Sequence, residues 1–186
     1  MRKVIIFIMT SLDGYFEGLN GDLSWHNVDA EFNKFAAEQL DAADVLLFGR
    51  KTYELMAGYW PSDQAVTDDP IIAGKMNSMP KIVFSTTLEK VKWNNTRLLK
   101  YNIAAELLKL KQQPGKDLLV LGSANLGTYL IEHKIIDEFR IMVNPVVLGV
   151  GTILFEGIKD QLKLKLLNTR TFRSGNVLHN YAPAGK

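Results

Sequence analysis

The sequence VLLFGRKTYE at residues 45–54 decides how the chain is expected to fold. Its first four residues are apolar, as in a strand that is covered on both faces. Gly49 ends that strand, and residues 51–57 have the composition of a short helix. A strand that turns through a glycine into a helix is the repeating unit of sheets built from parallel strands. The stretch therefore predicts an α/β fold.

The same alternation continues on both sides of this stretch. Apolar runs predict strands at residues 4–9, 81–85, 118–121 and 139–143. Helical spacing predicts a helix to residue 40 after an N-cap at Asp29, a short helix at 71–77 within a loop over 58–80, and helices at 102–113, capped by Asn102, and 123–133.

The last two strands have a different pattern. At residues 162–166 leucine alternates with lysine, which predicts a strand with one face in water, and a glycine-containing turn at 173–176 joins it to a strand at 177–181. The expected architecture is a mixed, mainly parallel sheet with flanking helices and a C-terminal antiparallel hairpin, in a single domain over residues 1–186.

Composition excludes several classes of function. Of the 186 residues 47% are hydrophobic and 23% charged, the net charge is +2, and there is no cysteine. Basic residues do not gather as a nucleic-acid groove requires, and the three histidines lack the spacing of metal ligands. The apolar run at residues 4–9 is too short for a signal segment or a membrane span. We therefore expect a cytoplasmic protein without nucleic acid, membrane or metal partners.

Three predicted strand ends carry residues suited to phosphate. Ligands of such sheets bind at the carboxyl ends of the strands. The first end has Gly49, Arg50, Lys51 and Thr52, where a helix N-terminus and two cations would attract a pyrophosphate. The alternative is a plain strand-to-helix turn with exposed basic side chains.

The other two ends have hydroxyl groups and small residues. Ser85 and Thr86 would hold a second phosphate, such as the 2′-phosphate of NADP, or simply form a Ser/Thr turn. The third end is GSANL, with Gly122, Ser123, Ala124, Asn125 and Leu126, which allows close backbone approach to a ring or phosphate but lacks the GxGxxG pattern. Its alternative is tight packing of helix on strand.

Taken together, these motifs resemble the dihydrofolate-reductase-like superfamily, in the branch with the riboflavin-biosynthesis reductase domain. The matching segments are TSLDG at 10–14, GRKTYE at 49–54, PKIVFS at 80–85, GSANL at 122–126, IDEF at 136–139 and the stretch from Pro145 to Phe155. The match is collinear over nearly the whole chain. It implies NADPH as cofactor, bound by Thr10 and by the three strand ends named above.

The resemblance also implies that the loop with Ser11 and Leu12 lies between the nicotinamide and the substrate, and Trp25 is a further candidate for the substrate site. Trp25 would stack on a flat heterocycle, as would Tyr59 and Trp60, although aromatic residues serve equally in a core or an interface. The proton donors expected for the reduction are Asp13, Asp29 and Glu31. Alternatively, Asp13 forms part of a turn, and Asp29 is the N-cap of a helix.

The substrate remains open at this level. The leading expectation is an NADPH-dependent reductase of the 5-amino-6-(5-phosphoribosylamino)uracil type, with a dihydrofolate or pterin reductase as the alternative. A non-catalytic nucleotide-binding or regulatory protein on the same scaffold is the third. Residues 145–155 and the last hairpin are apolar enough to form a subunit interface, so we expect a homodimer.

Overall fold

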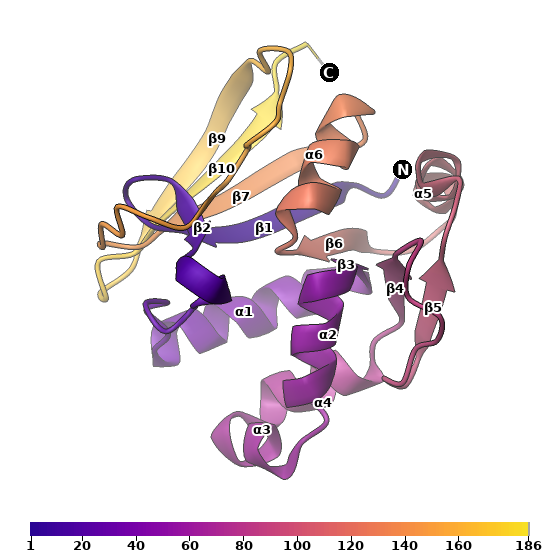
Figure 1. The fold of residues 1–186 in the computed structure, drawn as a ribbon, viewed down its shortest axis with the longest axis horizontal. Helices are drawn as coiled ribbons and strands as arrows, with labels where there is room; N and C mark the ends of the chain where they lie inside the picture. The colour runs from indigo at the N-terminus through magenta and orange to yellow at the C-terminus, as the bar shows by residue number, and fades with distance from the viewer. Residues whose placement is uncertain (186) are drawn as a thin grey trace.

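Eight strands form one sheet in the order β5-β4-β3-β6-β1-β7-β10-β9 (Figure 1). The computed structural model describes residues 1–185. Six strands are parallel: β1 (Val4–Thr10), β3 (Ala43–Gly49), β4 (Lys81–Phe84), β5 (Thr96–Leu99), β6 (Asp117–Leu121) and β7 (Glu138–Val143). The antiparallel hairpin of β9 (Leu164–Thr171) and β10 (Val177–Pro183) continues the sheet beyond β7. The predicted fold class is confirmed.

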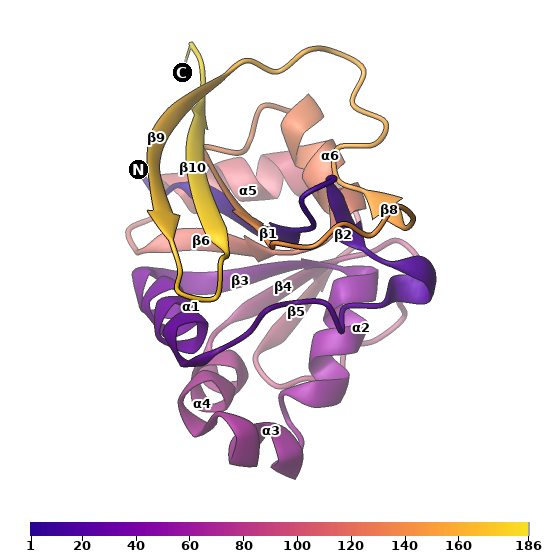
Figure 2. The ribbon, with the colours of Figure 1, turned by 90° about the vertical axis from the view of Figure 1, so that its left-hand side faces the viewer.

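Helices cover both faces of the sheet (Figure 2). On one face α1 (Ala30–Ala42), α2 (Arg50–Tyr59) and α4 (Pro70–Ser78) enclose one apolar core, and α3 (Asp63–Asp68) lies beyond them. On the other face α5 (Ile103–Gln112) and α6 (Ala124–Glu132) enclose a second core. Within residues 1–185, no helix is both long enough and apolar enough to cross a membrane.

Several short elements have no clear signal in the sequence. Strand β5 was not predicted, nor were β2 (Tyr15–Glu17) and β8 (Thr152–Ile153), which pair as a small separate sheet, nor the 3-10 turn η1 (Leu19–Gly21). The expected loop over residues 58–80 is mostly helical. Ser62 caps α3 through the N–H of Ala65 at 3.2 Å, and Asp69 caps α4 through the N–H of Ile72 at 2.9 Å.

The two predicted helix caps have different outcomes. Asp29 accepts a hydrogen bond from the Phe32 N–H at 2.8 Å, so its role as the N-cap of α1 is confirmed. Asn102 occupies the N-cap position of α5, but its side chain makes no capping bond. Its φ of 57° is left-handed, whereas a capping side chain needs extended backbone to reach the first free N–H groups. The prediction that Asn102 caps this helix was wrong.

Strand β9 does not have the one buried face that its alternation predicted. Leu164 and Leu166 are 37% and 51% exposed, and Arg170 is the one residue of the strand that is partly buried. The reason is its position, because β9 is the last strand at the sheet edge and the helices pack mainly on the strands inside it (Figure 2). The leucine-lysine alternation therefore marks an exposed edge.

Lys81 is a buried cation at the start of β4. Its side chain is 1% exposed, and its Nζ donates to the carbonyl oxygens of Met76, Asn77 and Met79 at 2.7, 3.2 and 2.6 Å. The Trp93 ring lies 4.5 Å from the same nitrogen. These carbonyls end α4, where the helix dipole is negative, so the ammonium group closes the helix and ties it to the sheet.

Candidate active site

The three predicted strand ends come together at one edge of the sheet. Strands β4, β3 and β6 are parallel neighbours, with Phe84 paired to Gly49 and Val120 paired to Leu47. Their carboxyl ends open into a cavity of about 870 Å³. The predicted cofactor residues that line it are Gly49, Arg50, Lys51, Thr52, Ser85, Thr86, Gly122, Ser123, Ala124, Asn125 and Leu126.

Two of these turns are in close contact. A Cβ atom on Gly49 would lie 2.0 Å from the Oγ and 3.1 Å from the Cβ of Ser123. Gly122 has a φ of +61° and faces the side chain of Thr52, which a Cβ would meet at 3.4 Å. Glycine is therefore favoured at both positions, at Gly49 by the space and at Gly122 by the backbone.

Two helix N-termini face this end of the cavity without a side-chain cap. Helix α2 begins after Gly49 and α6 after Ser123, and neither N-cap residue accepts a bond from the first turn. Their first N–H groups are thus available to an external acceptor, and the helix dipoles favour an anion there.

Cations stand beside the two helix N-termini. Lys51 and Lys100 line the cavity, as does Arg50, which also pairs with Glu54 at 3.5 Å. Lys100 directly follows β5, a strand that was not predicted, so its place here was not predicted either. This end of the cavity, which we call the turn end, is suited to phosphate groups.

The strand end after β4 is also a Ser/Thr turn, as its alternative predicted. The Ser85 hydroxyl accepts hydrogen bonds from the N–H groups of Thr87 and Leu88, at 3.2 and 2.9 Å. Ser85 is therefore held by its own turn, while the exposed Thr86 lines the cavity beside it. The two interpretations of this segment are compatible.

The other end of the cavity is enclosed by α1, α2 and α4 and is mainly apolar. Tyr59 and Trp60, whose role the sequence left open, line the cavity. Most of the other side chains of this apolar end were not singled out from the sequence, because their helical spacing reads as ordinary core: Phe32, Ala36, Leu40, Met56, Ile72 and Met76.

His26 lines the cavity from the loop that precedes α1. Burial lowers the pKa of its imidazole to about 4, so the ring is neutral at pH 7. Its Nε2 atom is buried and has no hydrogen-bond partner, and its ring meets Trp25 edge-on at 4.4 Å. The nitrogen is shielded from solvent, so the cavity wall is formed by other atoms of His26.

The pKa of His26 makes stability depend on pH in a defined direction. The unfolded chain takes up a proton at its ordinary pKa of 6.5 and the folded chain only at about 4, so stability is lost as the pH falls through this window. Between about pH 7 and about pH 4.5 the wild type should lose about 2 kcal/mol more unfolding free energy than His26→Gln. Urea unfolding of both proteins at each pH measures this difference, and equal losses would contradict the assignment.

The loop at residues 11–28 passes beside the cavity and is fastened at both ends. At its start, Asp13 accepts hydrogen bonds from the N–H groups of Leu148 and Gly149, at 3.1 and 2.7 Å. A hydrogen bond from Ser11 and these two N–H groups lower the pKa of Asp13 to about 2. This carboxylate is an ionised anchor, which suits it poorly to donate a proton.

At its other end the loop is held by buried asparagines. The Asn27 N–H donates to Asn144 Oδ1 at 2.9 Å, and Asn176 Nδ2 donates to the carbonyl oxygen of Asn27 at 2.9 Å. Asn27 Nδ2 also donates to the carbonyl oxygen of Ser174 at 2.8 Å. Both Asn144 and Asn176 are fully buried, so this end of the loop is fixed to the end of β7 and to the final hairpin.

The other two predicted proton donors are engaged outside the cavity. The Asp29 carboxylate caps α1. Glu31 accepts a hydrogen bond from the Arg173 N–H at 2.9 Å and pairs with Arg170 at 3.6 Å, so it faces the final hairpin. Neither residue is among those that line the cavity, nor is Asp13. Their catalytic role stays a prediction that this geometry does not support.

The residues predicted on the substrate loop lie near the cavity without lining it. Thr10 is buried at the end of β1, and the Ser11 hydroxyl accepts a bond from the Tyr15 N–H at 3.0 Å. Leu12 is 67% exposed, and the indole N–H of Trp25 donates to the carbonyl oxygen of Asp22 at 3.0 Å. The residues of this loop that line the cavity instead are Phe16, Glu17, Gly21, Leu23, His26 and Val28.

The sheet order and the site at its carboxyl edge define a dihydrofolate-reductase-like fold of the riboflavin-biosynthesis reductase type. The chain belongs to the RibD C-terminal domain family, whose model matches residues 2–178. It is 37% identical to the uncharacterized protein YyaP of Bacillus subtilis (strain 168) over 176 residues, which are 95% of this chain and 92% of YyaP.

Solved structures show the same fold at lower identity. A putative riboflavin biosynthesis protein from Shewanella sp. PV-4 has a TM-score of 0.75 at 24% identity, over 97% of this chain and 98% of that one. Dihydrofolate reductase from Enterococcus faecalis, complexed with NADP(H), has a TM-score of 0.67 at 14% identity, over 98% and 96% of the two chains.

Proposed function

We propose that the protein is an NADPH-dependent reductase of a small heterocyclic substrate. The observation that carries the proposal is the turn end of the cavity, where two uncapped helix N-termini meet Arg50, Lys51 and Lys100. A dinucleotide carries its anionic groups as phosphates, which such termini bind through backbone N–H groups. The E. faecalis reductase, which has the same fold, is complexed with NADP(H), and this supports the choice of cofactor.

The residues present fit this cofactor. The N-termini of α2 and α6 would hold the pyrophosphate, and Thr86 with Lys100 would hold a phosphate on the adenosine. When bound, NADPH supplies the hydride for reduction of a C=N or C=O carbon. The chain orients the substrate in the apolar end and excludes bulk water from it. We assign the proton to a water molecule in the cavity. Asp13, Asp29 and Glu31 do not line it, and the carboxylates that do already accept hydrogen bonds from the protein: Glu17 from Thr152, Asp68 from Tyr59 and Asp69 from the Ile72 N–H.

Lys51→Ala should weaken NADPH binding about fivefold, the loss of about 1 kcal/mol expected for one charge-assisted contact in a partly exposed site. Fluorescence titration of NADPH measures the affinity. Lys34→Ala is the matched control, since Lys34 lies on α1 and does not line the cavity. An equal effect of the two substitutions, or no binding of NADPH to the wild type, would contradict the proposal.

The rival function is a binding or regulatory protein that has the same site but no chemistry. Fold alone does not decide between the two. Oxidation of NADPH, followed by its absorbance across a panel of heterocyclic carbonyl and imine compounds, distinguishes them. We expect turnover with at least one compound, whereas NADPH binding without turnover over the whole panel would favour the rival.

We also propose that the protein forms a homodimer through strand β9. Leu164 and Leu166 pair with Pro183 and Tyr181 of β10, so they lie on one face of the hairpin, and both are well exposed. An exposed apolar edge strand is a liability that pairing with a second copy removes. Sedimentation equilibrium should give a dimer for the wild type and a shift of at least tenfold toward monomer for Leu166→Lys. A monomeric wild type would overturn the proposal.

A further inference from the structure

Charge is distributed unevenly along the cavity. The three cations that line it, Arg50, Lys51 and Lys100, all belong to the turn end. Helices α1 and α4, together with α2 beyond its first turn, contribute no lysine or arginine to the lining within the described residues. Once the turn end is filled by a dinucleotide, no lysine or arginine of the described cavity lining is left for a substrate in the apolar end, and Arg140, which lies behind Gln39, is paired with Glu138.

The charged groups beside the apolar end are carboxylates. Asp68 accepts a hydrogen bond from the Tyr59 hydroxyl at 2.8 Å, and Asp69 accepts one from the Ile72 N–H at 2.9 Å. Both line the cavity, and the bond to Asp68 raises the pKa of Tyr59. An anionic substituent in the apolar end would lose its hydration without gaining a counter-charge, and it would face two like charges.

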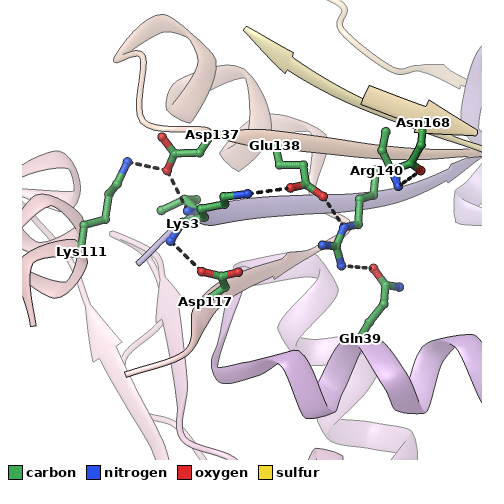
Figure 3. Close-up of polar contacts among 10 residues, drawn as sticks. Lys3, Gln39, Lys111, Asp117, Asp137, Glu138, Arg140 and Asn168 are labelled. Carbon is green, nitrogen blue, oxygen red and sulfur yellow. Dashed lines mark hydrogen bonds and ion pairs between the residues drawn. The ribbon is translucent and has the colours of Figure 1, made fainter. Parts of the chain in front are cut away.

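The apolar end also contains uncharged hydrogen-bonding groups. Gln39 Oε1 accepts a hydrogen bond from Arg140 Nη1 at 3.1 Å, and Arg140 is in turn held by Glu138 at 2.8 Å (Figure 3). Because this chain of contacts fixes the amide oxygen, the Gln39 nitrogen is directed away from Arg140 as a donor (Figure 3). Asn33 lines the same cavity.

We propose that the substrate is a flat, uncharged N-heterocycle that carries neither a phosphate nor a carboxylate. The apolar helices contact its faces, and the neutral Gln39 and Asn33 meet its ring oxygen and nitrogen atoms. The inference rests on the proposed function. In the reaction, a hydride from NADPH forms a C–H bond at the C=N or C=O carbon, a proton from water is added to the nitrogen or oxygen, and NADP⁺ is released.

Pterin and pterin-6-carboxylate provide a matched pair of probes that differ by one carboxylate. Their binding to the NADPH-saturated protein is measured by isothermal titration calorimetry. We expect pterin to bind at least tenfold more tightly than the carboxylate. Tighter binding of the carboxylate, equal binding of the two, or no binding of pterin would overturn the inference.

A charge introduced into the apolar end should reverse this preference. Asn33→Lys adds a cation to the cavity wall and should strengthen binding of pterin-6-carboxylate at least tenfold relative to pterin. Gln112→Lys, at the distant end of α5, should leave the ratio unchanged. An unchanged ratio in Asn33→Lys would count against the inference.

Failure of the proposed function has a separate signature. If NADPH fails to bind, pterin and pterin-6-carboxylate are titrated against the protein alone. A change of their affinities in Asn33→Lys then shows that they bind in the apolar end. Preference for pterin would then support the inference although the reductase assignment has failed. NADPH turnover together with tighter binding of pterin-6-carboxylate would support the reductase assignment and overturn the inference about the substrate.

Discussion

Gly49→Ala is expected to weaken NADPH binding about 100-fold, or about 2.7 kcal/mol. The new Cβ would stand 2.0 Å from Ser123 Oγ and 3.1 Å from Ser123 Cβ, so the Ser123 hydroxyl must rotate away and the turns after β3 and β6 must move slightly apart. Both turns begin helices whose free N–H groups face the cavity. Separation would misalign both sets of donors together, and each lost contact to a charged group is worth about 1.5–3 kcal/mol.

A second substitution tests whether this clash is the cause. Ser123→Gly removes both atoms that the Gly49→Ala side chain would meet, and the φ of 68° at Ser123 suits a glycine. The double variant should therefore recover most of the affinity in fluorescence titration. Gly58→Ala, near the far end of α2 with open space at its Cβ, is the control. Loss of affinity that Ser123→Gly leaves unrescued would refute the explanation.

Lys81→Ala is expected to lower the free energy of unfolding by about 3 kcal/mol, which for a chain of this size corresponds to a fall of about 6–12 °C in Tm. The truncation leaves the carbonyl oxygens of Met76, Asn77 and Met79 without their shared donor and opens a cavity beside Trp93. Burial lowers the pKa of Lys81 to about 8, so at pH 7 the side chain still carries its proton and donates three hydrogen bonds.

Lys75→Ala is the control for Lys81→Ala. Lys75 is on the same helix but pairs with the exposed Asp41, and pairs of this kind contribute little. It should change the free energy of unfolding by less than about 0.5 kcal/mol in urea titrations at pH 7. Similar losses for the two lysines would show that closure of α4 by Lys81 is not the source of the effect.

The turn end of the cavity could be predicted from the sequence because its signals are local. Gly49, Ser85 and Gly122 each stand directly after an apolar run, and parallel strands bring their carboxyl ends to one edge. Lys100 was not predicted, because the strand before it has no such local signal. It follows β5, a strand of four residues with only partial burial, whose pattern cannot be told from a loop.

The apolar end could not be predicted, because its residues have two functions at once. Met56 and Met76 pack against the core and also line the cavity, and no spacing distinguishes the two roles. The carboxylates could not be assigned for a different reason, because their hydrogen-bond partners lie far away in the sequence. Asp13 and Glu31 resemble free acids in the sequence, but backbone N–H groups from residues 135 or more positions away use them as acceptors. Long-range partners of this kind depend on the tertiary structure.

The fastening of the loop at residues 11–28 determines how a ligand can enter and leave. Asp13 is attached to the N–H groups of Leu148 and Gly149, and Asn27 to the buried Asn144 and Asn176. Between these points the loop is attached once more, where β2 pairs with β8. Only the part after Glu17 is therefore left to bow outward, and the loop cannot swing away like a hinged flap. Ligand exchange on this side would then involve bending of residues 18–26, while both attached ends of the loop stay in place.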